Sequence, residues 1–396
     1  MKPPPVVVPA DVRFPLERAN GIQIVKTAAA IARTGTPTTL VVRSTDPRPA
    51  AEILALYGVA SEVPLEVRRL RVLHRQGLFA LPRALFLLRA GLECWARCRR
   101  GGVVYTRDLQ LAELALRLGV RPLVYEAHAI ESVMYAERAR LYGTQQTPSP
   151  RKAARLAGRE RLVWTRADGV VTTTSGIRDG FADSYGERRR TLVVPNGCDI
   201  AGLGRFPGLA QDQPPRVVYA GQLYPWKGVD VLVEAMAETP SAQLVILGGF
   251  ETEPDLERVR RLVQTTGLAD RTSMLGTVPQ ARVAAELARA AVVVVPFLRS
   301  AMSERHTSPI KAFEAMGAGR PIVASDLPST REVLSDGRDA LLVPPGDAQS
   351  LASAVRRLLE DRELATRLAQ AAFEKAPRYT WDARARRLVE LFEEVA

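Results

Sequence analysis

The chain of 396 residues has few cysteines, few lysines and no long apolar run. Three cysteines in a chain of this length argue against a disulfide-stabilised secreted domain and favour a reducing compartment. Cys94 and Cys98 lack a second ligand pair at zinc spacing, so no structural zinc is expected. No apolar run reaches about 18 residues, and the start MKPPPVVVPA does not resemble a signal peptide. We therefore expect a cytoplasmic protein, either free or peripheral on the inner face of the cell membrane.

The basic residues are almost all arginines. Six lysines accompany 49 arginines, and the formal net charge is +12. A basic balance suits an acidic partner such as nucleic acid or an anionic membrane. We find no zinc pattern, no basic helix with heptads and no aromatic RNA-binding signature, so we expect no nucleic-acid partner. Against this background lysine is a rare choice, which draws attention to Lys227 and Lys311.

Residues 65–100 combine large apolar side chains with nine arginines. A basic amphipathic segment of this kind suits the surface of an anionic membrane. An ordinary pair of helices, with leucine and phenylalanine inward and arginine outward, explains the same composition.

Short apolar runs alternate with helical patterns along the chain. This alternation is typical of βαβ units and a mostly parallel sheet. We expect strands at 6–9, 38–43, 103–105, 123–125, 169–173, 192–194, 217–220, 243–248, 272–275, 292–296, 321–325 and 340–343. We expect helices at 21–33, 109–118, 175–185, 228–237, 254–266, 280–289, 309–317, 329–335, 347–359, 363–374 and 381–394. Two doubly wound domains in tandem, with a hinge near 195–215, fit this series.

The segment 307–334, TSPIKAFEAMGAGRPIVASDLPSTREVL, is the most informative part of the sequence. Ser308 occupies the expected N-cap of a helix and Pro309 its first position, while Gly317 and Gly319 end it. The start of a helix offers free N–H groups and the positive end of the helix dipole, which together suit an anion.

Charged side chains strengthen the prediction of an anion site at this helix. Lys311 adds a positive charge in the first turn, and Glu314 follows on the same face. This arrangement suits a nucleotide, with phosphates at the helix start and ribose hydroxyls on Glu314. A plain cap with a surface ion pair between Lys311 and Glu314 is the alternative.

Other candidates follow predicted strands, because ligands of open α/β sheets bind beyond the carboxyl ends of the strands. The loop from Gly221 to Gly228 carries Lys227 and leads into a helix, which favours a phosphate site. Gly248 after the next strand and the pair Asn20-Gly21 after the first strand allow close backbone approach. Simple turn chemistry would also explain these glycines.

His128 follows the strand at 123–125. A lone histidine is more often structural than catalytic, but its place at the carboxyl end of a strand favours a functional role. Glu126 and Glu131 flank it, and either carboxylate could orient the imidazole.

Taken in order, these motifs resemble family 4 retaining glycosyltransferases of the GT-B fold. The resemblance runs from Asn20-Gly21 through His128, PNGCD at 195–199 and AGQLYPWKGVDVLVEAM at 220–236 to 308–334, and so covers almost the whole chain. It implies an α/β fold with two doubly wound Rossmann-like domains facing across a cleft. The domains would be an acceptor-binding domain at 1–195 and a nucleotide-sugar-binding domain at 196–378. A final helix at 379–396 would pack back on the first domain.

The resemblance also implies roles for individual residues. His128, Lys227 and Lys311 would be catalytic, with both lysines on the diphosphate and His128 facing the donor sugar. Gly21 would let the first-domain loop approach the diphosphate, and Glu314 would bind the ribose hydroxyls. The N–H groups near Thr307 and Ser308 would also bind the donor. The remaining donor-binding positions would be Gly221, Gln222 and Gly248.

Two positions depart from the family pattern. Gln222 stands where the family usually has an arginine of the phosphate clamp. His306 stands where the family usually has the first glutamate of a pair, which bears on recognition of the donor sugar. Glu304 lies two residues too early to replace that glutamate.

The resemblance implies retaining transfer of a sugar from a nucleotide-diphosphate sugar to an acceptor hydroxyl. The acceptor would be a sugar, a lipid-linked group or a small molecule in the synthesis of cell-envelope polysaccharide, glycolipid or a related glycoconjugate. No Asp-x-Asp motif lies in a plausible site, so we expect no metal in the chemistry and no further cofactor. A sugar-nucleotide epimerase, a phosphorylase and a non-catalytic nucleotide-sugar-binding subunit are the alternatives.

Overall fold

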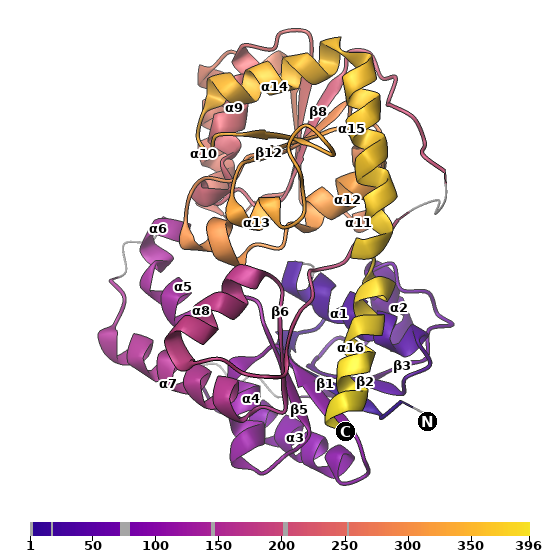
Figure 1. Cartoon of the computed structure of the whole chain (residues 1–396), viewed down its shortest axis with the longest axis vertical. Helices are drawn as coiled ribbons and strands as arrows, with labels where there is room; N and C mark the ends of the chain where they lie inside the picture. Colours follow the sequence, from indigo (N-terminus) through magenta and orange to yellow (C-terminus); the bar gives the residue numbers. More distant parts are fainter. Residues whose placement is uncertain (1–2, 17–18, 72–79, 144–146, 201–204, 252) are drawn as a thin grey trace. The chain divides into compact units, whose positions relative to one another are not determined.

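The computed structural model describes residues 3–16, 19–71, 80–143, 147–200, 205–251 and 253–396. The chain forms two compact units, each built on one sheet (Figure 1). The first unit comprises residues 1–133, 149–197 and 381–396, and the second comprises residues 134–148 and 198–380.

The sheet of the first unit has seven parallel strands in the order β3-β2-β1-β4-β5-β6-β7. Its strands are β1 (Val6–Arg13), β2 (Thr38–Arg43), β3 (Leu65–Leu70), β4 (Val103–Thr106), β5 (Leu123–Ala127), β6 (Gly169–Thr172) and β7 (Thr191–Val193). Its helices are α1 (Ala19–Arg33), α2 (Ala50–Leu56), α3 (Ala80–Cys98), α4 (Leu109–Arg117), α7 (Pro150–Arg166), α8 (Ser175–Tyr185) and α16 (Trp381–Val395). The helix α5 (Glu131–Ala136) crosses the boundary between the units.

The sheet of the second unit has six parallel strands in the order β10-β9-β8-β11-β12-β13. Its strands are β8 (Arg216–Ala220), β9 (Gln243–Leu247), β10 (Thr272–Gly276), β11 (Val292–Val295), β12 (Ile322–Ser325) and β13 (Leu341–Val343). Its helices are α6 (Arg138–Tyr142), α9 (Val229–Ala237), α10 (Pro254–Thr265), α11 (Gln280–Ala288), α12 (Ile310–Gly317), α13 (Pro328–Arg331), α14 (Ala348–Glu360) and α15 (Arg362–Lys375).

Both faces of the second sheet are covered, as the apolar runs of its strands require. Successive residues of β8 point to opposite faces: Val217 packs in a core with α9, α10 and α14, whereas Val218 packs in a core with α11, α12 and β12. Strand order reverses between β8 and β11 here, and between β1 and β4 in the first unit. The crevices beyond the carboxyl ends of these strands are the places where a doubly wound sheet binds ligands.

The predicted alternation of strands and helices is confirmed in both units, and each predicted strand overlaps an observed one. Three predictions were wrong in detail. β1 runs on to Arg13 and α13 ends at Arg331. Residues 65–70 form the strand β3, which neither the basic amphipathic segment nor the helix pair considered for 65–100 includes. β3 carries Glu66, Arg68 and Arg69 among its apolar residues, which suits its place at the edge of the sheet. The part of 65–100 from 72 to 79, and residues 201–204 of the predicted hinge, lie outside the described residues.

Two segments belong to a unit whose other residues lie far from them in the sequence. α16, the last helix, packs against α1 in the first unit. Residues 134–148 belong to the second unit, where Leu141 enters the core and Tyr142 makes an edge-to-face contact with Tyr224 at 5.1 Å between ring centroids.

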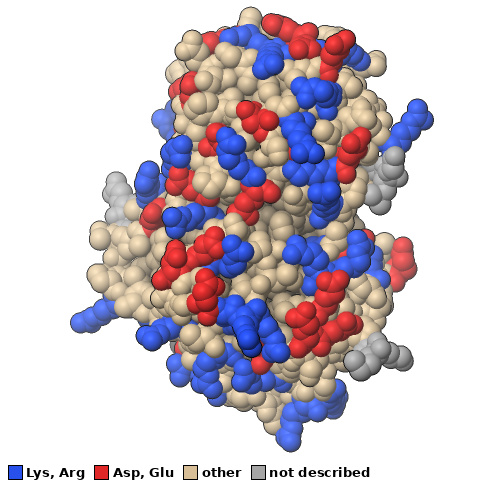
Figure 2. Space-filling model, in the orientation of Figure 1, with Lys and Arg blue, Asp and Glu red and all other residues tan. Residues whose placement is uncertain are grey.

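Charge is mixed on the face that Figure 2 shows, where acidic side chains lie among the basic ones. Within the described part of the chain, no helix has the length and apolar character needed to cross a bilayer.

Candidate active site

The turn after β8 is built by glycines that let two chain segments meet. Gly221 follows β8, and its N–H donates to the carbonyl of Leu247 at 2.8 Å. Gly248 follows β9 with φ of 119°, and a Cβ there would overlap the carbonyl of Gly221. Only glycine fits this position, so the predicted close backbone approach is real. The backbone that Gly248 approaches here is that of Gly221.

The loop after Gly221 is anchored to the segment that follows β11. The N–H of Leu298 donates to the carbonyl of Trp226 at 2.9 Å. Gly228 has φ of 70°, and a Cβ there would overlap the carbonyl oxygen of Pro296. The loop carrying Lys227 is therefore held at the point where strand order reverses in the second sheet.

Lys227 lies over two aromatic rings. Its Nζ is 4.0 Å from the ring centroid of Trp226 and 4.4 Å from that of Phe297. These rings attract a cation, but burial disfavours the charged form and lowers the pKa of Lys227 to about 7. An incoming anion would restore the charge, which makes Lys227 a strong candidate for binding a phosphate.

The structure corrects the start of the helix in 307–334. α12 begins at Ile310 with Pro309 as its N-cap residue, and no side chain caps it, so Ser308 is not the N-cap. Pro309 has φ of −81° and ψ of 88°, which lie outside the helical region. The predicted end is confirmed, since α12 stops at Gly317 and Gly319 has φ of 64°.

Lys311 and Glu314 form an ion pair on α12. The Nζ of Lys311 lies 2.6 Å from Oε2 of Glu314, and both side chains are partly exposed. The structure thus brings these two candidates together on one helix face. Each still has access to solvent, and so to a ligand.

Residues 302–306 form one turn of π-helix directly before this segment. The turn is bound by polar contacts: the Thr307 hydroxyl donates to the carbonyl of Met302 at 2.8 Å, and Ser329 Oγ donates to the carbonyl of Ser303. Thr307 and Ser308 are both buried. Glu304 pairs with Arg299 at 2.8 Å, so its carboxylate is engaged there.

Several buried polar atoms near these loops lack partners among the described residues. They are the amide oxygen of Gln222, the indole N–H of Trp226 and both ring nitrogens of His306. Burial, followed by the charge of Arg305, lowers the pKa of His306 to about 4, so its ring is neutral. Unpaired buried polar groups are rare in folded proteins, and a polar ligand would account for them.

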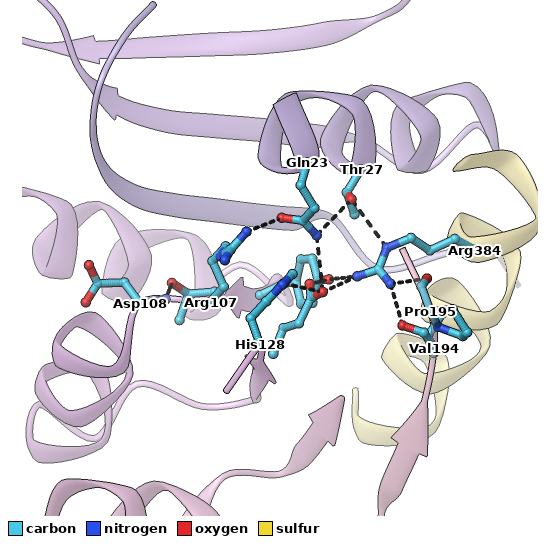
Figure 3. Close-up of polar contacts among 11 residues, drawn as sticks. Gln23, Thr27, Arg107, Asp108, His128, Val194, Pro195 and Arg384 are labelled. Carbon is cyan, nitrogen blue, oxygen red and sulfur yellow. Dashed lines mark hydrogen bonds and ion pairs between the residues drawn. The ribbon is translucent and has the colours of Figure 1, made fainter. Parts of the chain in front are cut away.

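In the first unit, His128 lies just beyond β5 beside a buried carboxylate. Its Nε2 is 2.8 Å from Oε1 of Glu126, so Glu126 rather than Glu131 contacts the imidazole. Burial, followed by the charge of Arg107, lowers the pKa of His128 to about 4. Figure 3 shows this cluster with Gln23 and Arg107 on one side and Arg384 on the other.

Asn20 and Gly21 lie in α1, so the alternative of a simple turn is wrong, whereas the predicted close approach of backbone at Gly21 is observed. Gly21 lies in the first turn of α1, where its N–H donates to the side-chain oxygen of Asn20 at 2.9 Å. A Cβ at Gly21 would overlap the carbonyl oxygen of Leu16. Because Gly21 has no side chain, the backbone of Leu16 can lie against it.

Sequence reasoning missed Arg384 and Tyr105, which hold Glu126. Arg384 forms a buried ion pair with Glu126, and the Tyr105 hydroxyl donates to the same carboxylate. One signal was available: Arg384 falls on the apolar stripe of α16, between buried Trp381 and Leu388. A charge at such a position requires a buried partner.

The described residues contain no group of three or more His, Cys, Asp or Glu side chains placed to hold a metal ion. The residues that could hold a ligand are instead the cations and helix start of the second unit and the His128 cluster of the first.

The sequence matches known families over most of its length. Residues 21–197 match the glycosyl transferase 4-like domain, and residues 204–375 match the glycosyl transferases group 1. The D-inositol 3-phosphate glycosyltransferase of Geodermatophilus obscurus is 31% identical over 280 residues, which are 66% of this chain and 58% of that protein. The phosphatidyl-myo-inositol mannosyltransferase of Mycobacterium leprae is 35% identical over 214 residues, which are 52% of this chain and 54% of that protein. The matched region thus spans little more than half of these relatives.

Solved structures share the fold at lower identity. Sucrose-phosphate synthase of Thermosynechococcus elongatus superposes with a TM-score of 0.73 at 22% identity, covering 99% of this chain and 98% of that one. HepE of Anabaena in complex with UDP-glucose gives a TM-score of 0.70 at 19% identity, covering 98% and 99%. The two parallel sheets are thus those of the GT-B fold, and with both family models matched in sequence order, the chain belongs to the group 1 glycosyltransferases with a glycosyl transferase 4-like N-terminal domain.

Proposed function

We propose that the protein transfers a sugar from a nucleotide-diphosphate sugar to an acceptor hydroxyl with retention of configuration. The observation that carries the proposal is Lys227, which is desolvated over two aromatic rings on a glycine-rich loop at the point where strand order reverses. A diphosphate would give this ammonium a counter-charge that none of the described residues supplies. Family membership and the UDP-glucose complex of the structurally similar HepE support the same donor class.

Lys227 and Lys311 would stabilise the leaving diphosphate. The bond between C1 of the sugar and the phosphate oxygen breaks, leaving negative charge on the diphosphate and positive charge on the ring. Cationic side chains placed where negative charge develops lower the barrier. The acceptor oxygen bonds to C1 on the same face, and its proton passes to the departing phosphate oxygen. Two lysines and the start of α12 supply the positive charge, so we propose that no metal ion or further cofactor takes part.

Other residues would orient the donor. Glu314 would accept hydrogen bonds from the ribose hydroxyls, and the N–H groups near Thr307 and Ser308 would meet phosphate or sugar oxygens. Gln222 and Gly248 would line the phosphate side. His128 would contact the donor sugar as a neutral imidazole, consistent with its lowered pKa.

The acceptor would be a hydroxyl of a cell-envelope polysaccharide or glycolipid precursor. The Mycobacterium leprae relative is named for a lipid acceptor, phosphatidyl-myo-inositol. A lipid-linked acceptor would require the protein to reach a membrane surface, and α3 offers a suitable helix face.

The outer face of α3 is both apolar and basic. Leu85, Leu88, Leu92 and Trp95 recur at helical spacing and are 44%, 50%, 55% and 42% exposed. Arg99 lies over the Trp95 ring, 4.8 Å from its centroid. The buried face instead carries Phe86, Ala90 and Cys94. We propose that the outer face docks peripherally on anionic phospholipid at the inner surface of the cell membrane.

Two measurements test the donor proposal. A thermal-shift screen of UDP, GDP, ADP and TDP identifies the base, because a ligand that binds the folded state raises the melting temperature. Radiolabelled sugar nucleotides of that base are then incubated with candidate acceptors. We expect transfer with release of the nucleoside diphosphate and an α- or β-linkage matching the donor. No stabilisation by any nucleotide and no transfer would refute the proposal.

A further inference from the structure

Arg384 is an arginine of the last helix that is almost completely buried. Its Nη1 donates to the carbonyls of Val194 and Pro195, each at 2.7 Å, and its Nη2 pairs with Glu126. Its Nε is 3.4 Å from the Thr27 hydroxyl of α1 (Figure 3). Burying a guanidinium is unfavourable unless its charge is compensated and its donors are paired. These contacts meet that requirement beside the candidate active-site histidine.

Side chains from several helices and strands contact the carboxylate of Glu126. Gln23 Nε2 donates to its Oε1 at 3.1 Å, the Tyr105 hydroxyl donates to its Oε2, and His128 Nε2 lies 2.8 Å from Oε1. Burial raises the pKa of Glu126, but Arg384 and then His128 outweigh burial and bring it to about 2. The carboxylate is therefore ionised and acts only as an acceptor.

An ionised carboxylate at 2.8 Å favours one tautomer of His128. Nε2 lies at ion-pair distance from this carboxylate but without hydrogen-bond geometry. Because the carboxylate only accepts, a hydrogen on Nε2 is the arrangement that this contact favours. In a neutral ring the other nitrogen, Nδ1, then has a free lone pair and accepts a hydrogen bond. A sugar hydroxyl is a donor of the right kind.

The charges around His128 decide whether its ring remains neutral. Glu126 favours protonation of the ring, whereas Arg107 and Arg384 oppose it. Without Arg384, Glu126 would be left with His128 as its counter-ion, and a proton would be drawn onto the imidazole. Nδ1 would then become a donor.

We propose that Arg384 is a positioning residue for His128: by neutralising Glu126, it leaves that carboxylate to hold His128 as a neutral imidazole with Nδ1 as acceptor for a hydroxyl of the donor sugar. The last helix thereby contributes to the active site through a side chain that does not touch substrate. The inference rests on the proposed function, in which His128 contacts that sugar.

Imidazole nitrogen NMR of the full chain tests this directly, because the sequence has only three histidines. His128→Asn identifies the His128 signals. In Arg384→Met we expect the pKa of His128 to rise by on the order of one pH unit or more, as when a like charge is removed. The acid limb of kcat/KM should move upward with it.

Arg33→Met is the matched control. Arg33 of α1 pairs with Asp382 of α16, so its removal loosens the same helix pair without touching Glu126. We expect neither the His128 signals nor the acid limb to move in this variant. Equal changes in both variants would mean that Arg384 acts only by docking α16, and would overturn the proposal.

The double variant Glu126→Gln/Arg384→Met guards against failure to fold, since it removes both buried charges together. A glutamine can accept or donate, so we expect both tautomers of His128 and a loss of kcat of about 10- to 100-fold, the range seen when an orienting partner is lost. An unchanged tautomer would overturn the positioning role whatever the turnover. Wild-type turnover of His128→Asn would instead refute the role proposed for His128 itself, and with it the functional meaning of Arg384.

Discussion

Arg384 and Glu126 stand 258 positions apart in the sequence and form an ion pair in which each side chain is 2% exposed. The pair joins the last helix to the strand that leads to His128. One contact therefore bears on both the stability of the first unit and its candidate chemistry, and the two effects can be separated by experiment.

Breaking one side of this pair should destabilise the first unit strongly. Removing one member of a buried ion pair leaves the other charge uncompensated, which costs about 3–5 kcal/mol. We expect a loss of this size for Arg384→Met and a smaller one for Glu126→Gln/Arg384→Met, measured by denaturant unfolding. Arg33→Met, at an exposed pair, should lose about 1 kcal/mol or less. A double variant as unstable as Arg384→Met would show that packing, not charge, dominates at this position.

The strands and most helices could be predicted because buried parallel strands read as continuous apolar runs. β3 was not predicted because Glu66, Arg68 and Arg69 interrupt its apolar run, as its place at the edge of the sheet allows. The helices within 131–166 were not predicted, and neither was the assignment of 134–148 to the second unit. That assignment depends on Leu141, whose burial in a core far along the chain leaves no local pattern.

Some residues of the candidate site could likewise be predicted from the sequence and others could not. Lys227 and the segment containing Lys311 could be found because glycines, lysines and a helix start follow one another locally. The place of Gly21 in α1 was not predicted, because the sequence does not show that the carbonyl of Leu16 lies beside it. Arg384 acts on a carboxylate contributed by a distant strand, so no spacing rule reveals it.

Lys311→Ala should lower turnover by on the order of 100-fold or more, as for loss of a charge contact made in the transition state. Stability should change little, because the pair with Glu314 is partly exposed. Steady-state kinetics and thermal denaturation measure the two effects. Arg331→Ala, which removes an exposed ion pair with Asp326 in the same unit, serves as control. Near-normal turnover of Lys311→Ala would contradict the assigned role.

Binding of a nucleoside diphosphate should take up a proton through Lys227. Burial lowers the pKa of this lysine to about 7, from an ordinary 10.5. A bound anion favours the charged form, so at pH 8 the lysine passes from mostly neutral to charged on binding. At pH 6 it is already charged, and uptake should vanish.

Calorimetry of UDP binding at pH 8 in HEPES and in Tris measures this uptake, since the buffers differ in ionisation enthalpy. We expect close to one proton for the wild type and none for Lys227→Met. Another diphosphate takes the place of UDP if the thermal-shift screen favours its base. Uptake that persists in Lys227→Met would assign the proton to another group.

His306→Leu should stabilise the protein while impairing use of the donor. Both ring nitrogens of His306 are buried without a partner among the described residues, and replacing such a group by an apolar one recovers about 1–3 kcal/mol. Its pKa is lowered from 6.5 to about 4, so the folded state disfavours protonation. The wild type therefore loses stability as the pH falls from 6.5 towards 4, and the variant should lose less.

Thermal denaturation across this pH range and the KM for the donor separate the two effects. Thr191→Val is the control, because it removes from β7 of the other unit a hydroxyl that has no partner in the described part of the chain. This variant should be stabilised without an effect on use of the donor. Unchanged donor kinetics in His306→Leu would show that the ring nitrogens of His306 do not bind the donor.

The exposed face of α3 should bind anionic vesicles. Co-sedimentation with vesicles of phosphatidylcholine containing phosphatidylglycerol should retain the wild type, whereas pure phosphatidylcholine should not, because the arginines require negative charge. Leu88→Gln/Leu92→Gln should lose binding, since it removes apolar side chains that would enter the interface. Leu56→Gln changes a leucine of α2 that is 42% exposed, against 50% and 55% for Leu88 and Leu92, and should bind as the wild type does. Equal binding by all three proteins would assign the interaction to general basic charge and refute a docking role for this helix face.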